Sequence, residues 1–158
     1  MSTIHDLRRI LGTCKTIAVV GLSPQWHRPS FFAAKYMQAH GYRIIPVNPM
    51  ATEILGERCY PSLSAAAADH RIDMVDCFRK SEDIPPLADE AIAIGARCLW
   101  MQLGVVNEPA AARARAAGLD VVMDRCVKIE HARLFGGLGW FGVNTRVISS
   151  RRPQQLPY

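Results

Sequence analysis

The sequence lacks several features that would assign it to a broad class of protein. No uninterrupted apolar run approaches the ~20 residues that a membrane-spanning helix requires. Residues 1–9 have neither the basic start nor the apolar centre of a signal peptide, so we expect a cytoplasmic protein. Hydrophobic residues make up 49% of the chain and charged residues 21%, a balance that argues against global disorder. The length of 158 residues is enough for one domain with a sizeable core.

Paired cysteines and metal-ligand spacings are also missing. The five cysteines fall at irregular intervals, without a CxxC pair or a zinc-type spacing of His and Cys. We therefore expect free thiols and no metal site. The five are Cys14, Cys59, Cys77, Cys98 and Cys126.

Acidic residues are missing from the end of the chain. No carboxylate side chain follows Glu130, whereas four arginines do. The whole chain has 19 basic and 14 acidic residues, a net charge of +5. This excess is compatible with an anionic ligand, and a solvated basic tail is the simpler interpretation. Nucleic-acid binding is not expected, because aromatic and basic residues are not interleaved.

Short apolar segments alternate along the chain with segments of helical character. The apolar segments do not alternate with polar residues, which is typical of parallel strands buried on both faces by helices. We predict an α/β fold, a Rossmann-like doubly wound parallel sheet of about five strands with helices on both faces. The predicted strands are residues 17–22, 42–48, 72–78, 96–102 and 119–124. The predicted helices are residues 4–11, 30–40, 62–70, 88–94, 108–117 and 126–134.

The composition changes near residue 135. Residues 1–134, including the helix at 4–11, are predicted to form the folded domain. Residues 135–158 are rich in Gly and Pro and carry basic residues, so we interpret them as an extension of the chain. Its Trp140 and Phe141 are candidates for contact with a neighbouring surface, including that of a second copy.

The three-glycine fingerprint of dinucleotide-binding proteins is absent where the first strand ends. The loop "GLSPQWHRPS" has a single glycine, Gly21, and matches neither GxGxxG nor GxxxxGK[ST]. It does offer the Ser23 hydroxyl, the Arg28 cation and Ser30, which we expect to cap the next helix. Ligands of open parallel sheets bind at the carboxyl ends of the strands, and helix N-termini attract phosphate. The loop is therefore predicted to cradle phosphate; a simple helix cap beside a surface arginine is the alternative.

An acidic residue is absent from the end of the second strand. This strand ends at Val47, Asn48 and Pro49, and the nearest carboxylate is Glu53. NAD-binding folds commonly place Asp or Glu there to hold the ribose hydroxyls, and that carboxylate would repel a phosphorylated ribose. The sequence thus argues against NAD and tolerates a nucleotide with a phosphate on its ribose.

Several motifs together resemble a known family. "VVGLS" with "RPS", "YRIIPVNP", "VDCFR", "LWMQLGV" and "VVMDRC" with "KIE" occur in this order. They resemble the small bacterial CoA-binding proteins, which are similar to the N-terminal CoA-binding domain of the succinyl-CoA synthetase alpha subunit. The resemblance covers residues 16–134. It implies that coenzyme A or an acyl-CoA lies across the carboxyl edge of the sheet.

The resemblance also implies which residues contact coenzyme A. Those by the phosphates would be Gly21, Ser23, Arg28 and Ser30. Those at the adenosine end would be Asn48 and Pro49. Those lining the channel would be Phe78, Arg79, Gln102, Leu103 and Gly104.

No catalytic arrangement is apparent in the sequence. An acyl-CoA synthetase of this lineage also needs a phosphohistidine domain and an ATP-grasp partner, and no residues are predicted to be catalytic. We therefore expect a non-catalytic CoA-binding protein; an NAD(P)-dependent oxidoreductase or another nucleotide-binding enzyme is the alternative.

Reactive side chains at the ends of strands leave further options open. Cys77 and Cys126 each follow a strand and lie near an arginine in sequence, which could lower the thiol pKa and allow a mixed disulfide with CoA. Buried small residues are the alternative interpretation of both thiols. Asp76 and Asp124 also end strands; for these, capping or pairing with arginine is favoured over acid–base catalysis.

Overall fold

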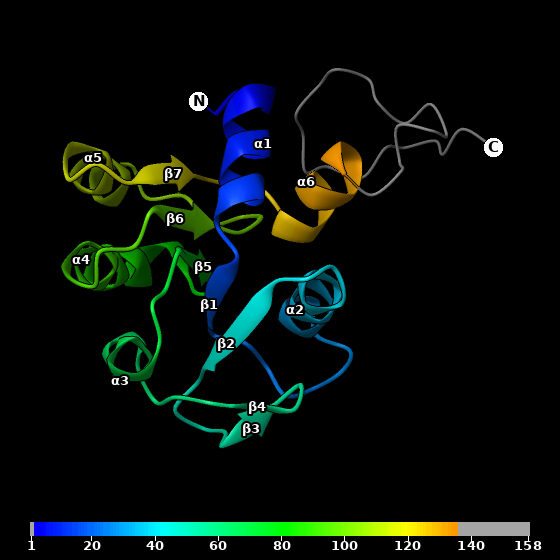
Figure 1. Ribbon diagram of the computed structural model, residues 1–158. Helices are drawn as coiled ribbons and strands as arrows, with labels where there is room; N and C mark the ends of the chain where they lie inside the picture. The colour runs from blue at the N-terminus through cyan, green and yellow to red at the C-terminus, as the bar shows by residue number, and fades with distance from the viewer. Residues whose placement is uncertain (1, 136–158) are drawn as a thin grey trace.

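A computed structural model describes residues 2–135 of the chain. These residues form a five-stranded sheet in the order β2-β1-β5-β6-β7 (Figure 1), and every neighbouring pair is parallel. The expected Rossmann-like α/β fold is confirmed. The strands are β1 (Thr16–Val20), β2 (Arg43–Val47), β5 (Met74–Cys77), β6 (Cys98–Met101) and β7 (Asp120–Val122).

Helices cover both faces of the sheet, three on each (Figure 1). Because successive side chains of a strand point to opposite faces, Ala18 and Val20 pack beneath α3, α4 and α5, whereas Ile17 and Val19 pack beneath α1, α2 and α6. The sheet is thus buried on both faces, which explains its uniformly apolar strands. The helices are α1 (Ile4–Thr13), α2 (Pro29–Ala39), α3 (Leu63–Asp69), α4 (Ile84–Ala93), α5 (Glu108–Ala116) and α6 (Val127–Leu134).

None of the helices within residues 2–135 combines the length and the apolar character needed to cross a bilayer.

The strand order reverses beside β1. From β1 the chain crosses to β2 at one edge of the sheet, and it then returns to β5 on the other side of β1. The loops that follow β1 and β5 therefore leave the sheet in opposite directions at its carboxyl edge. Such a reversal is where open α/β sheets form a ligand-binding crevice.

Local structure departs from the sequence predictions in three places. Helix α2 begins at Pro29 with Arg28 as its N-cap, so the prediction that Ser30 caps this helix is wrong. Helix α4 begins at Ile84, earlier than expected, because prolines are accepted in the first turn of a helix. An unpredicted hairpin, β3 (Glu53–Ile54) with β4 (Glu57–Arg58), follows β2.

The proposed C-terminal extension lies almost entirely outside the described residues. Phe135 is the last residue described, directly after α6. Trp140 and Phe141, which were expected to contact a neighbouring surface, fall beyond it.

Candidate ligand-binding site

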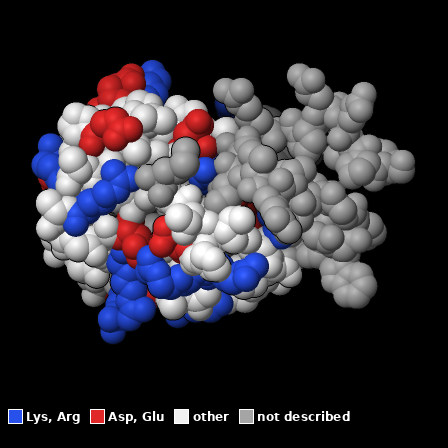
Figure 2. All heavy atoms as spheres, turned by 90° about the horizontal axis from the view of Figure 1, so that it is seen from above, with Lys and Arg blue, Asp and Glu red and all other residues white. Residues whose placement is uncertain are grey.

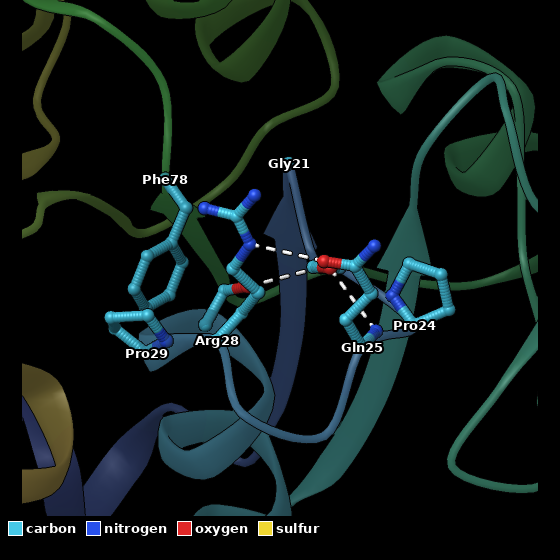
Figure 3. Close-up of a pocket in the computed structure, with 8 residues that line it drawn as sticks. Gly21, Pro24, Gln25, Arg28, Pro29 and Phe78 are labelled. Atoms are coloured by element: carbon cyan, nitrogen blue, oxygen red, sulfur yellow. Dashed lines mark hydrogen bonds between the residues drawn. The ribbon is translucent and has the colours of Figure 1, made fainter.

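A pocket of about 480 Å³ lies at the point where the strand order reverses. We call it the first-loop pocket, because the loop after β1 and the first turn of α2 form most of it, and Phe78 after β5 completes it (Figure 3). Its lining includes five of the eleven residues predicted to bind the ligand. These are Gly21, Ser23, Arg28, Ser30 and Phe78.

Gly21 lets the two diverging loops touch. Its φ is +86°, in the left-handed region that favours glycine, and a Cβ there would clash with the carbonyl oxygen of Phe78. The Gly21 N–H donates to the Val47 carbonyl at 2.9 Å, and the Phe78 N–H donates to the Val20 carbonyl at 2.9 Å. Gly21 is therefore required by the contact between the loops that frame the pocket.

Ser23 and Ser30 hold the loop after β1 in a closed shape. The Ser23 N–H donates to Ser30 Oγ at 3.0 Å, and the Gln25 N–H donates to Ser23 Oγ at 3.1 Å. Ser30 is only 5% exposed, so its hydroxyl supports the loop and does not cap the helix. Each of the two serine hydroxyls thus accepts a backbone hydrogen bond that holds the loop in shape.

The first turn of α2 presents a backbone donor and a guanidinium to the pocket. Pro29 has no N–H, and the Ser30 N–H has no acceptor within residues 2–135. Arg28 is exposed, and its Nε donates to Gln25 Oε1 at 3.1 Å, so that Arg28 lies between Gln25 and Phe78 (Figure 3). Among residues 2–135, no other charged residue lines this pocket. A helix N-terminus and an arginine together favour an anion.

Arg79 belongs to a second pocket, of about 450 Å³, on the opposite face of the sheet. We call it the α3–α4 pocket, because residues from the start of α3 and from α4 line it together with the ends of β1 and β2. Its walls combine the apolar Val47 and Leu87 with carboxylates such as Glu90. Arg79 Nε also lies 3.4 Å from where a Cβ on Gly21 would be, so this arginine sits between the two pockets.

Asn48 and Pro49 line neither pocket. Asn48 Nδ2 donates to the Leu22 carbonyl at 2.9 Å, and Asn48 Oδ1 accepts from the Met50 N–H at 2.8 Å. The amide thereby ties the loop after β2 to the loop after β1. Both polar groups of the Asn48 side chain are thus engaged in hydrogen bonds that hold these loops in place.

The residues after β6 are also separate from both pockets. Gln102 is 3% exposed, and its Nε2 donates to Asp76 Oδ1 at 2.6 Å. Leu103 is 51% exposed, and the Gly104 N–H donates to Asp124 Oδ1 at 2.7 Å. Asp124 therefore braces the neighbouring loop, and Asp76 pairs with an amide instead of an arginine.

Neither thiol at the strand ends has the environment of a reactive cysteine. Cys77 is fully buried, and burial raises its pKa well above the ordinary value. Burial also raises the pKa of Cys126. This effect outweighs the opposite effect of the Lys128 and Ile129 N–H groups that face its sulfur. The option of a thiol pKa lowered by a nearby arginine is therefore wrong, because desolvation disfavours a thiolate; the alternative interpretation, a buried small residue, holds for Cys77.

No group of three His, Cys, Asp or Glu side chains in the described part of the chain is placed to hold a metal ion. The donors of the first-loop pocket are a guanidinium, hydroxyls and an amide N–H, which suit phosphate oxygens instead.

Residues 15–132 of the chain match the CoA binding domain family. This chain belongs to the CoA binding domain family. The protein YneT of Bacillus subtilis is 43% identical over 127 residues, which make up 80% of this chain and 93% of that protein. A solved structure of a hypothetical protein from Pyrococcus horikoshii OT3 is 40% identical with a TM-score of 0.81, over 85% of this chain and 94% of the other.

A longer enzyme contains a similar segment. The ADP-forming acetate–CoA ligase II of Archaeoglobus fulgidus is 40% identical over 63 residues, which are 39% of this chain but only 9% of that protein. The similar segment is therefore less than half of this chain and a small part of that ligase.

Positive charge on this CoA-binding domain is not confined to the first-loop pocket. Figure 2 looks down on the molecule from the side that carries the N-terminus, and Lys and Arg side chains gather along one part of that face, with carboxylates among them. Net charge alone therefore does not locate the site. The shape of the crevice and the donors that line it are the more specific signals.

Sequence reasoning missed some of the lining of both pockets. Pro24, Gln25 and Pro29 line the first-loop pocket, and their place in the loop after β1 was the available signal. Ser62, at the start of α3, lines the α3–α4 pocket. It is the N-cap of that helix, and its Oγ accepts from the Ala65 N–H at 3.1 Å. The strand order that brings α3 to the crevice is not encoded in any local motif.

Proposed function

We propose that this CoA-binding domain binds coenzyme A, or an acyl-CoA, across the carboxyl edge of its sheet without catalysing a reaction on it. The observation that carries the proposal is the first-loop pocket. It lies at the reversal of strand order, with Arg28 as the one charged lining residue from the described part of the chain and with the Ser30 N–H at a helix N-terminus. Membership of the CoA-binding family supports the same ligand.

In this proposal the first-loop pocket holds the diphosphate. A guanidinium, a backbone N–H and a serine hydroxyl each donate hydrogen bonds to phosphate oxygens, and the bonds from charged donors are the strong ones. Arg79 lies between the two pockets and is assigned to phosphate as well. In this arrangement the ligand passes from one face of the sheet to the other where Gly21 contacts Phe78.

The α3–α4 pocket is assigned to the adenine. It has the apolar side chains of Val47, Leu63 and Leu87 for the ring, and the carboxylate of Glu90 as an acceptor for the exocyclic amine. Its three carboxylates, Glu82, Asp83 and Glu90, make it unfavourable for a phosphate. The first-loop pocket therefore takes the anionic diphosphate, and the α3–α4 pocket takes the uncharged adenine.

A panel of ligands tests the proposal. CoA, acetyl-CoA, NAD, NADP and ATP would be compared by thermal unfolding and by calorimetric titration. A ligand at 100 times its Kd stabilises the folded state by about 2.7 kcal/mol, which raises the Tm of a chain of this size by roughly 5–10 °C. We expect this shift for CoA or acetyl-CoA. A shift with NAD and none with CoA would contradict the proposal and favour the oxidoreductase alternative.

A pair of arginine variants localises the binding. Arg28→Ala removes the charged donor of the first-loop pocket, and we expect about 10- to 100-fold weaker CoA binding. Arg71→Ala removes an exposed arginine before β5, at the opposite edge of the sheet, and is the matched control. Pantetheine, which lacks the phosphates, should lose little affinity in either variant. Equal losses for CoA and pantetheine would exclude Arg28 from the phosphate site.

The proposal includes a cytoplasmic location and a small-molecule ligand instead of a macromolecular one. All five cysteines carry free thiols, which supports a reducing compartment because oxidising compartments favour disulfides.

A further inference from the structure

A carboxyl group is buried in the middle of the sheet without a charged partner. Asp76, on β5, is 1% exposed and lies between Val19 of β1 and Trp100 of β6 in the strand register. Its hydrogen bond is with the neutral amide of Gln102. Buried carboxylates are normally paired with a cation, so this one is unusual.

Within residues 2–135, the charged groups that α6 and the loop before it bring to this face of the sheet pair with one another instead of with Asp76: Glu130 Oε1 lies 3.8 Å from Arg125 Nη1 and 3.8 Å from Arg133 Nη1. The titration of Asp76 is governed by burial and by the Gln102 hydrogen bond alone, and it forms no ion pair within residues 2–135. The titratable groups that interact with it electrostatically are the thiols of Cys77, Cys98 and Cys126. Three helices cover this face of the sheet. The residues they bury are Leu7, Ile10 and Leu11 of α1, Ser30, Ala33, Ala34 and Met37 of α2, and Val127, Glu130 and His131 of α6.

Burial raises the pKa of Asp76 from 3.8 to about 7, because a charged carboxylate loses its hydration there. The proton on this group is therefore exchanged near neutral pH. A modest change in the local potential is enough to add or remove it.

Asp76 lies one layer beneath the floor of the first-loop pocket. It is level with Val19 in the sheet. Gly21 and Phe78, which line the pocket, come directly after the ends of β1 and β5, two residues beyond Val19 and Asp76. Residues i and i+2 of a strand share a face, and each residue rises about 3.3 Å. Two such steps place the Cα of Asp76 roughly 7 Å below the pocket residues, and Phe78 packs against the same face of the sheet as Val19 and Trp100.

A phosphate in the first-loop pocket would act on Asp76 through the protein interior. Interactions between buried charges are only weakly screened by salt. At about 8 Å and an effective dielectric constant of about 20, one negative charge raises the pKa of a carboxyl group by on the order of one unit. The nearby positive charge of Arg28 is exposed to solvent, which weakens its opposing effect.

We propose that Asp76 takes up a proton when a phosphate-bearing ligand occupies the first-loop pocket, so that ligand affinity falls as the pH rises through neutrality. The inference rests on the proposed CoA binding and adds a proton-linked regulation of that site. Gln102 positions the carboxyl group, and neither residue touches the ligand.

Calorimetry with Asp76→Asn tests this coupling. CoA would be titrated at pH 7.5 in two buffers that differ in ionisation enthalpy, which counts the protons taken up. The phosphates of CoA contribute equally in wild type and variant, so the difference belongs to Asp76. For a shift of one unit from pH 7, linkage predicts about half a proton more in the wild type. The wild-type Kd for CoA should also rise about tenfold more than the variant Kd between pH 6 and pH 9.

Asp89→Asn is the matched control, because Asp89 is an exposed carboxylate on α4 and should keep the wild-type proton count. Equal proton counts and equal pH profiles in wild type and Asp76→Asn would overturn the coupling. Absence of CoA binding at every pH would overturn the proposed function and the coupling together.

A measurement on the wild-type protein avoids any dependence on how the variant folds. The ¹³C signal of the Asp76 carboxyl carbon would be followed against pH with and without CoA. We expect a midpoint near 7 for the free protein and a rise of about one unit with CoA bound. An unchanged midpoint in a protein that binds CoA would refute the coupling alone.

Discussion

Replacing Asp76 by Asn should stabilise the ligand-free protein, and by a larger amount at high pH than at low pH. The carboxyl group is buried, and its folded-state pKa is about 7. The unfolded chain loses this proton near pH 3.8, so between these two pH values the folded state binds more protons and stability falls as pH rises. A difference of about 3 units corresponds to about 4 kcal/mol, fully developed above pH 7. Asn keeps the acceptor for Gln102 Nε2 but carries no charge.

Urea denaturation of wild type and Asp76→Asn at pH 5 and pH 9 measures this effect. The variant should gain about 1–2 kcal/mol of relative stability at pH 5 and about 4 kcal/mol at pH 9. Asp89→Asn, which changes an exposed carboxylate on α4, should show no such pH-dependent gain. A stability difference between wild type and Asp76→Asn that is the same at both pH values would refute the reasoning.

Three further substitutions test the framework of the site and the contact between α2 and α6, where Tyr36 Oη and His131 Nδ1 are hydrogen-bonded at 3.0 Å. Gly21→Ala places a side chain at positive φ against the neighbouring loop and should destabilise the fold by about 1–3 kcal/mol or more and weaken CoA binding; unchanged stability in urea would contradict the close contact of the loops. Ser30→Ala leaves the Ser23 N–H without its acceptor and should lower stability by about 1–3 kcal/mol, while Ser64→Ala, an exposed control, should not. His131 is buried, and burial lowers its pKa below 6.5. The wild type should therefore lose stability as the pH falls below 6.5, because the unfolded chain then binds the proton more readily than the folded protein. Denaturation at pH 5 and pH 7 should show a smaller loss of stability in His131→Phe, and an equal loss would remove His131 as the cause.

The fold could be predicted from the sequence because its signals are local and repeated. The strands of the parallel sheet are mainly apolar and buried on both faces, with Asp76 of β5 as a buried polar exception, and helices follow them along the chain. The hairpin of β3 and β4 was missed because its two-residue turn is Leu55–Gly56, with both residues at positive φ. Such turns are usually recognised by Asn-Gly or Asp-Gly, and leucine gives no comparable signal.

The residues of the candidate site that come from a single loop could be predicted from the sequence. The residues that distant loops contribute were harder to predict. Gly21, Ser23, Arg28 and Ser30 lie in one short loop and line one pocket. Gln102 was expected to line the channel, but its side chain turns inward to Asp76. The depth of a side chain below the sheet edge depends on its register with neighbouring strands, which a single sequence does not specify.

The amide spectrum of the uniformly ¹⁵N-labelled protein during titration with CoA tests the central claim most directly, because it reports both binding and its place. The account predicts the largest shifts for the amides of Gly21, Ser23, Gln25 and Ser30, with Phe78 and Arg79 next. The small pocket at the opposite edge of the sheet, where Arg115 and Asp120 lie, should be unaffected. Saturable shifts confined to that opposite edge, or no shifts at millimolar CoA, would contradict it.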